Sequence, residues 1–213
     1  MSRLVSGYYN EFYPFDQLQK WDACIYTSNP DHLQPGDTLI IWGGADISPS
    51  LYNKKKSKHT WAEEFPSHRD AVEWALMQRA KELGCPIIGV CRGGQMLCAL
   101  AGGFLIQHVN NHGGAHKVIT IDGTTVITNS IHHQMMYPWN VKHVMLASIK
   151  EQRSNVHLDV DTDIQIPEEP ECVYFPEVKG LAIQWHPEMM QVSSDATQFV
   201  FNKYKEYVND GAL

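Results

Sequence analysis

The sequence predicts an α/β protein built on parallel strands, and three observations support this fold class. Apolar runs at residues 38–42 and 86–90 have the length and β-branched content of strands that are buried on both faces. A glycine pair follows each run, as is typical of the turn that leads from a parallel strand into a helix. Between the two runs, residues 67–83 have apolar positions at helical spacing, and Gly84 provides a stop signal.

Length and composition favour one soluble enzyme-sized domain. The chain has 213 residues, enough for a large core, and we expect a single domain over residues 1–213. A net charge of −7 argues against a general nucleic-acid or membrane surface. No stretch is apolar enough to span a bilayer and the N-terminus lacks a secretory signal, so we expect a cytoplasmic protein. Five scattered cysteines without a Cys-x-x-Cys pair predict reduced thiols rather than disulfides or a zinc knuckle.

The N-terminal half is predicted to alternate strands and helices. The first elements have weak boundaries: strands at 4–9 and 23–27 on either side of a short helix at 15–21. The basic run from Lys54 to Lys58 predicts a solvated loop, with contact to an anionic substrate as the alternative. The helix at 67–83 leads into the strand at 86–90, which is followed by a helix at 95–101.

The C-terminal half contains more strands than helices. An extended segment at 103–106 precedes a hairpin whose strands, 117–121 and 125–128, flank Asp122-Gly123. We expect further strands at 144–149, 171–175 and 181–185, the last two paired, and a helix at 194–208 that begins at Ser194. The acidic, proline-containing segment 150–170 lacks the pattern of a calcium loop and predicts an exposed loop.

Cys91 lies in a turn that has the spacing of a nucleophile elbow, Gly89-Val-Cys91-Arg-Gly93. A residue in a tight strand-to-helix turn needs neighbours without Cβ atoms, because the strand and the helix pass within contact distance of it. The turn also places the sulfur at the positive end of a helix, which favours a thiolate. The alternative is a buried structural cysteine in a glycine-rich turn.

Two further stretches could complete a catalytic site around this cysteine. Gly43 and Gly44 follow a buried strand, so their N–H groups could point into a cleft as an oxyanion hole, or they could simply form a turn. His186 and Glu188 can project to the same side of an extended segment stiffened by Pro187. A thiol nucleophile needs such a base and a group that orients it.

Polar clusters elsewhere have weaker functional indications. His108, His112 and His116 are four residues apart, but Gly113-Gly114 interrupts a helical face, so we expect a polar loop near the cleft rather than a metal site. The stretch from Asn129 to Gln134 follows a strand and fits either substrate recognition or a satisfied turn. The sequence predicts no metal and no cofactor.

These residues carry a resemblance to a known family. Gly89-Val-Cys-Arg-Gly-Gly-Gln95 and Gln184-Trp-His-Pro-Glu188 resemble the two signature segments of class I, or triad-type, glutamine amidotransferases. The segment 43–52, the arginine after the cysteine and the stretch 129–134 are similar to the γ-glutamyl hydrolase branch, which includes γ-glutamyl-γ-aminobutyrate hydrolases. The likeness extends from about Thr38 to Met189, whereas the N-terminal region matches poorly.

The resemblance implies a central, mainly parallel sheet flanked by helices in a flavodoxin-like three-layer arrangement. It implies Cys91 as nucleophile, His186 as general base and acid, and Glu188 as the residue that orients the imidazole. The oxyanion hole then consists of N–H groups of Gly44 or Gly43 and of Arg92. Residues implied to lie near the bound glutamyl group are Gln95, Asn129, Ser130, His132 and His133.

The activity implied is hydrolysis of a glutamine or γ-glutamyl amide through a γ-glutamyl thioester, with release of ammonia or an amine. Three hypotheses remain open at this point. The first is a stand-alone γ-glutamyl amide hydrolase acting on a small molecule, and the second is a glutaminase subunit that delivers ammonia to a separate synthase. The third is a non-catalytic binding module on the same fold, which the intact Cys91, His186 and Glu188 argue against. A homodimer is also left open.

Overall fold

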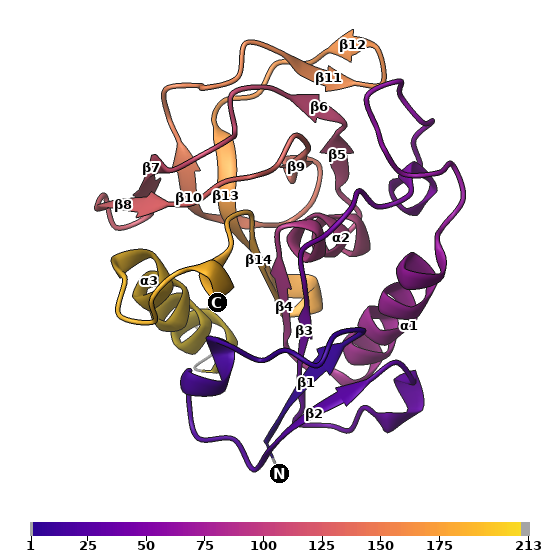
Figure 1. Ribbon diagram of the computed structural model, residues 1–213, viewed down its shortest axis with the longest axis vertical. Helices are drawn as coiled ribbons and strands as arrows, with labels where there is room; N and C mark the ends of the chain where they lie inside the picture. Colours follow the sequence, from indigo (N-terminus) through magenta and orange to yellow (C-terminus); the bar gives the residue numbers. More distant parts are fainter. Residues whose placement is uncertain (1, 210–213) are drawn as a thin grey trace.

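A computed structural model describes residues 2–209 and contains a nine-stranded sheet that crosses the molecule (Figure 1). In spatial order its strands are β2 (Ala23–Thr27), β1 (Arg3–Gly7), β3 (Thr38–Ile41), β4 (Ile87–Val90), β14 (Gly180–Ile183), β13 (Glu169–Phe175), β10 (Val144–Ile149), β7 (His116–Thr120) and β8 (Thr125–Thr128). The first five are parallel, and the rest continue the sheet with antiparallel pairings. The sheet is therefore mixed, and its parallel half contains both strands that precede glycine turns.

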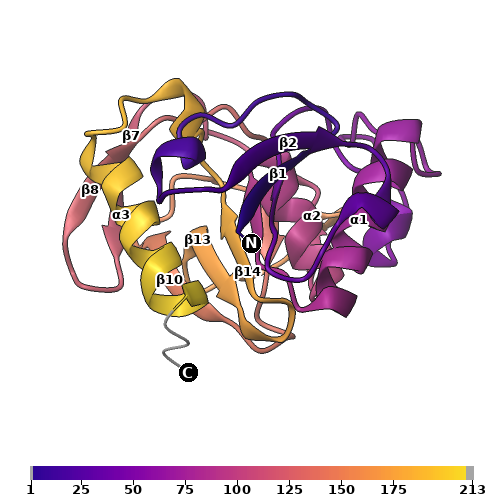
Figure 2. The ribbon, with the colours of Figure 1, turned by 90° about the horizontal axis from the view of Figure 1, so that it is seen from below.

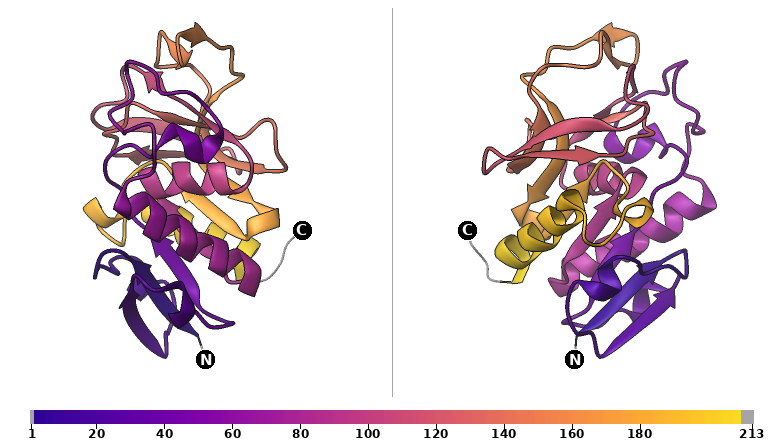
Figure 3. Two further views of the ribbon diagram at one scale, coloured as in Figure 1. Left: turned by 90° about the vertical axis from the view of Figure 1, so that its right-hand side faces the viewer. Right: turned by 60° about the vertical axis from the view of Figure 1, so that its left-hand side comes forward.

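Helices cover both faces of the parallel half, which gives three layers (Figures 2 and 3). On one face, α1 (His68–Leu83) and α2 (Arg92–Leu100) pack on a core that includes Leu39, Ile41 and Ile87. On the other, α3 (Asp195–Tyr204) packs through Phe199 and Val200 against the opposite side chains of the same strands. Successive strand residues point to opposite faces, so fully apolar strands bury both. The predicted fold class is confirmed.

Short elements complete the chain. Two small sheets lie beside the main one, with the strands β5 (Phe104–Ile106), β6 (His108–Val109), β9 (Met135–Tyr137), β11 (His157–Asp159) and β12 (Thr162–Asp163). The 3₁₀ helices span Phe15–Gln17, Pro30–His32, Pro49–Tyr52, Pro176–Val178 and Pro187–Met189, and a π-helical turn spans Lys205–Asn209. Among residues 2–209, no helix combines the length and apolarity needed to cross a bilayer.

Helix boundaries follow the local signals in the sequence. Ser67 and Asp70 form a reciprocal capping box at the start of α1, and Gly84 ends the helix in the left-handed conformation. Ser194 caps α3 as expected, accepting a hydrogen bond from the Thr197 N–H. The helix expected at 15–21 is instead a single 3₁₀ turn, Phe15–Gln17, anchored by the buried Phe15 ring.

The segment 150–170 is not the exposed loop that its composition suggests. It contains β11 and β12, and β13 begins at Glu169, whose side chain is fully buried. Lys54, from the basic run, forms an ion pair with Asp159 at 2.5 Å and lies over the Phe104 ring. The charges of the acidic and basic stretches therefore partly neutralise each other, and the Lys54 ammonium group is already paired with Asp159.

Candidate active site

The turn at Cys91 has the geometry of a nucleophile elbow. Cys91 follows β4 and has φ 49° and ψ −107°, a conformation that is strained for a residue with a Cβ atom. A Cβ on Gly89 would lie 2.4 Å from the Gly93 carbonyl oxygen, and one on Gly93 would lie 2.0 Å from the Ile41 oxygen. Both glycines are therefore required by close backbone approach, as their spacing predicts.

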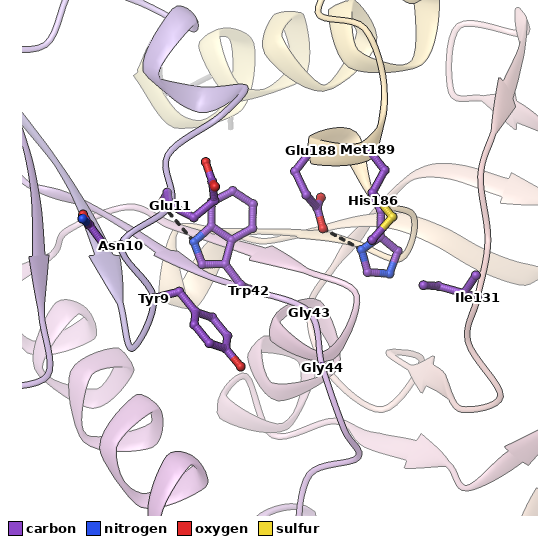
Figure 4. Close-up of a pocket in the computed structure, with 10 residues that line it drawn as sticks. All are labelled: Tyr9, Asn10, Glu11, Trp42, Gly43, Gly44, Ile131, His186, Glu188 and Met189. Carbon is purple, nitrogen blue, oxygen red and sulfur yellow. Dashed lines mark hydrogen bonds and ion pairs between the residues drawn. The ribbon is translucent and has the colours of Figure 1, made fainter.

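His186 and Glu188 lie beside this turn at the end of β14, on a 3₁₀ turn (Pro187–Met189). The His186 Nδ1–H donates to Glu188 Oε1 at 2.6 Å, a contact that Figure 4 shows from the side of the neighbouring pocket. Burial lowers the pKa of His186, but Cys91 and Glu188 more than compensate and raise it to about 10. The site therefore favours an imidazolium between the Cys91 sulfur and the Glu188 carboxylate.

Gly43 and Gly44 lie directly after β3, against the predicted catalytic residues. A Cβ on Gly43 would approach His186 Cε1 to 2.7 Å and Cys91 Cβ to 3.5 Å, so no larger residue fits there. The Arg69 guanidinium donates to the carbonyl oxygens of Trp42, at 3.0 Å, and Gly43, at 2.9 Å. Arg69 thus fixes the peptide groups whose N–H groups are candidates for the oxyanion hole.

A buried charge network lies beneath this loop. The Arg92 side chain forms ion pairs with Asp70 and Glu73, while Arg69 binds the same Glu73 at 3.0 Å. Burial raises the pKa of Glu73, and the two arginines oppose this shift. Arg92 therefore contributes its side chain to packing α2 on α1, and only its backbone N–H remains as a candidate for oxyanion binding.

Two cavities adjoin the site and share Gly44 and Ile131. The smaller, about 80 Å³, contains Cys91 and is bounded by Gln95, Asp46 and the stretch 131–134. The larger, about 550 Å³, lies on the other side of His186; Figure 4 shows Trp42, Tyr9 and Met189 around it. The small cavity is the candidate glutamyl pocket, and the larger one lies where a leaving group would emerge.

The predicted substrate-binding residues divide into two groups. Gln95, His132 and His133 line the small cavity. Asn129 does not: its side chain donates to the His186 carbonyl at 2.9 Å and accepts from the His186 N–H at 2.8 Å. Ser130 is buried and donates to the His112 carbonyl. Neither residue lines either of the two cavities; both side chains instead bind backbone groups, and Asn129 holds the backbone of His186.

Several site residues were not predicted from the sequence. The Gln184 amide donates to Cys91 Sγ at 3.8 Å. The Trp61 ring packs at a tilt against His133, which itself pairs with Asp46 at 3.0 Å. Gln184 lies two residues before His186 on the same strand end, and this alternation was an available signal. Asp70 and Glu73 lie on the face of α1 that also buries Leu76 and Ala80, and this spacing was the only signal for them in the sequence.

Comparison with known proteins identifies the family. Residues 29–188 match the family described as peptidase C26. The chain belongs to the peptidase C26 family. This family relationship and the fold place it in the class I glutamine amidotransferase superfamily, and indicate an enzyme that acts on an amide bond.

Individual relatives agree with this assignment. The peptidase C26 chain is 32% identical over 170 residues to the Rv2859c protein of Mycobacterium tuberculosis, which is named as a candidate glutamine amidotransferase. This match covers 70% of the chain but only half of that protein. Protein NtpR of Enterococcus hirae is 28% identical over 78% of the chain and 72% of its own length.

Solved structures share the fold at low sequence identity. A glutamine amidotransferase from Thermotoga maritima has a TM-score of 0.56 at 13% identity, covering all of this chain and 86% of its own. The glutaminase domain of Trypanosoma brucei CTPS, solved with bound acivicin, has a TM-score of 0.56 at 14% identity over 98% of this chain and 94% of its own. At these identities the likeness establishes the fold of this peptidase C26 member.

Replacing Glu188 by glutamine is expected to move the alkaline limit of activity. The carboxylate raises the pKa of His186, so its loss should shift the alkaline limb of kcat/KM from near pH 10 downward by at least about one unit. We expect kcat at pH 8 to fall on the order of 100-fold. The measurement is a pH profile of amide hydrolysis, with Glu177→Gln, on the exposed turn before β14, as the control.

The same pair makes stability depend on pH. Because the folded pKa of His186 lies above its ordinary value of 6.5, the pair stabilises the fold fully below pH 6.5 and loses this effect as the pH rises towards 10. Glu188→Gln should therefore flatten the decline of the melting temperature over this range. Identical profiles for Glu188→Gln and Glu177→Gln would contradict the assigned role.

Proposed function

We propose that this chain hydrolyses γ-glutamyl amides through a covalent thioester on Cys91. The observation that supports this most strongly is the arrangement of the Cys91 elbow beside the His186–Glu188 pair, with a cavity on each side. A thiol, an imidazole and a carboxylate in this order are the parts of a cysteine nucleophile with its base and orienting group.

In the proposed reaction, the Cys91 thiolate attacks the γ-carbonyl carbon and forms a C–S bond. N–H groups of Gly44 and Arg92 stabilise the oxyanion, and each such donor lowers the barrier by about 3 kcal/mol. The imidazolium of His186 protonates the leaving nitrogen as the C–N bond breaks. His186 then takes a proton from water, which attacks the thioester, and the C–S bond breaks to release a γ-carboxylate.

The large cavity supports an amine larger than ammonia as leaving group. Its volume of about 550 Å³ falls within the range of small-molecule sites, and Tyr9 and Trp42 supply aromatic surface. Its lining contains the carboxylates of Glu11 and Glu188 but no lysine or arginine. We therefore favour an amine with a neutral or cationic tail over one that carries a carboxylate.

A panel of γ-glutamyl amides tests this function. We expect amine release from the amide of a diamine to exceed release from the amide of an ω-amino acid of equal length by about five- to tenfold in kcat/KM. Glu11→Gln should reduce this preference, whereas Glu63→Gln, an exposed carboxylate outside the cavity lining, should not. Equal rates for both amides, unaffected by Glu11→Gln, would contradict the proposed leaving-group site.

A glutaminase that supplies ammonia to a separate synthase is the second candidate. One observation favours it: Trp61, Ile131 and Met189, which line the two cavities, are exposed apolar side chains. A partner that covered this rim would bury them. This candidate predicts hydrolysis of glutamine alone, at a rate that rises when the partner is added, and no release from the larger amides.

A further inference from the structure

Beside residues 129–134 lies a buried cluster of histidines and glutamates that the proposed reaction does not use. Its centre consists of His112, His132 and Glu171, whose side chains are at most 2% exposed. The two histidines come from adjacent backbone segments joined by the Gly113–Ile131 bridge, and Glu171 projects from β13. The chain therefore brings together three ligand-type side chains from distant positions.

Polar atoms in this cluster lack hydrogen-bond partners among the described residues. They are Nδ1 of His112, Nε2 of His132 and Oε2 of Glu171. A buried polar atom without a partner is costly, and several at one point are rare in native proteins. These unpartnered atoms indicate that the cluster binds a further group.

The remaining ring nitrogens are held in the way that metal-binding histidines require. Nδ1 of His132 is 2.9 Å from the Gln134 carbonyl oxygen, so Nδ1 carries the proton and Nε2 presents a lone pair. Nε2 of His112 lies 3.3 Å from Glu169 Oε2, which leaves Nδ1 of His112 as the nitrogen available to bind a metal ion. An outer carboxylate or carbonyl that orients each histidine is the usual second shell of a metal site.

The ligand atoms are at a spacing that one small cation can bridge. His112 Nδ1 and His132 Nε2 each lie 3.7 Å from Glu171 Oε1. If each of the three residues offers one ligand atom, these atoms all lie within 4.8 Å of one another. A tetrahedral zinc ion with bonds of 2.0–2.1 Å holds its ligands about 3.4 Å apart. The two histidine–carboxylate separations need to shorten by about 0.3 Å, whereas a separation near the 4.8 Å limit needs to shorten by about 1.4 Å, which side-chain rotation has to supply.

We propose that His112 Nδ1, His132 Nε2 and a carboxylate oxygen of Glu171 bind one Zn²⁺ ion. Two imidazoles and one carboxylate are a known zinc ligand set, and water can take the fourth position. His116 supports the carboxylate, since its Nε2 lies 3.2 Å from Glu171 Oε1. The expectation that no metal binds in this part of the chain considered His108, His112 and His116 on one helical face interrupted by Gly113-Gly114. His108 lies outside the cluster and stacks on His59.

The ion would act as a structural link next to the catalytic centre. His132 lines the cavity that contains Cys91. The backbone carbonyl of Glu171 accepts a hydrogen bond from the backbone N–H of Gln184, whose side chain contacts the same cysteine. A metal shared by His132 and Glu171 would therefore fix one wall of the glutamyl pocket to the central sheet. No reacting atom needs to touch the ion.

Metal analysis of the full chain tests this proposal without reference to activity. We expect the purified protein to contain about one equivalent of zinc, to lose it to a chelator, and to recover it from zinc sulfate. Zinc at about 100 times its dissociation constant should raise the melting temperature of the metal-free chain by about 5–10 °C. Cobalt should give the visible absorption of a tetrahedral site.

Matched variants locate the site. Glu171→Gln and His112→Asn should each weaken zinc binding at least about tenfold, and His108→Gln, outside the cluster, should not. If either variant fails to fold, the measurements on the unsubstituted chain still decide the matter. Less than a tenth of an equivalent of zinc after reconstitution, with an unchanged melting temperature and no cobalt absorption, overturns the proposal and leaves a cluster of histidine–carboxylate pairs.

Discussion

Replacing Cys91 by alanine is expected to reduce hydrolysis of γ-glutamyl amides by at least about 10⁴-fold, because the proposed thioester cannot form without the sulfur. Substrate affinity should persist, since the cavity around Cys91 keeps its other lining residues. The measurement is release of amine or ammonia under single-turnover conditions, together with binding of an unreacted amide by calorimetry. This variant separates loss of chemistry from loss of the pocket.

Cys98→Ala supplies the matched control for that prediction. Cys98 lies on the same helix α2, two turns after Cys91, and is fully buried against the Phe104 carbonyl. Its replacement removes a thiol of equal size from the same element without touching the predicted site. Activity that survived Cys91→Ala and disappeared with Cys98→Ala would contradict the assignment of the nucleophile.

Replacing Arg92 by methionine is expected to lower the free energy of unfolding by about 3–5 kcal/mol, because it leaves buried carboxylates without their partner. The Arg92 side chain is 3% exposed, and its partners Asp70 and Glu73 are 2% and 0% exposed. Arg69 still reaches Glu73, so Asp70 loses the most. Denaturant unfolding gives the change in free energy.

Arg79→Met provides the comparison, because Arg79 lies on α1, the helix that carries the partners of Arg92. Arg79 pairs with Glu82 on the exposed side of α1, where an ion pair contributes about 0–1 kcal/mol. The two variants thus make the same chemical change in a buried and an exposed setting. Equal losses of stability would show that the network beneath Gly43 and Gly44 does not stabilise the fold as its burial implies.

Local patterns in the sequence predicted the parts of the site that depend on nearby residues. The Gly89 and Gly93 spacing anticipated the backbone contacts around Cys91. His186 and Glu188 do pair, but across a 3₁₀ turn, Pro187–Met189, rather than by alternation along an extended segment. The boundaries of α1 followed equally from its capping residues. In each case the physical cause lies within a few residues of its effect.

Features that depend on distant contacts could not be predicted in this way. Glu169 lies in an acidic, proline-containing stretch and Glu171 directly follows it, yet both are buried. Their partners include His112 and His116, which are 55 or more residues away in the sequence. Asn129 was assigned to the substrate, whereas its amide fits the backbone of His186, 57 residues later. The composition of a segment indicates whether it is polar, but it does not indicate which side chains from other segments will contact it in the folded chain.

The most direct test of the central proposal is to trap the covalent intermediate. The chain is mixed with a γ-glutamyl amide, quenched in acid within its first turnover, digested, and analysed by mass spectrometry. The account predicts a γ-glutamyl adduct on the peptide that contains Cys91, stronger in Glu188→Gln if hydrolysis of the thioester slows more than its formation, and absent in Cys91→Ala. Amide hydrolysis that persists in Cys91→Ala, or an adduct on another cysteine, would contradict it.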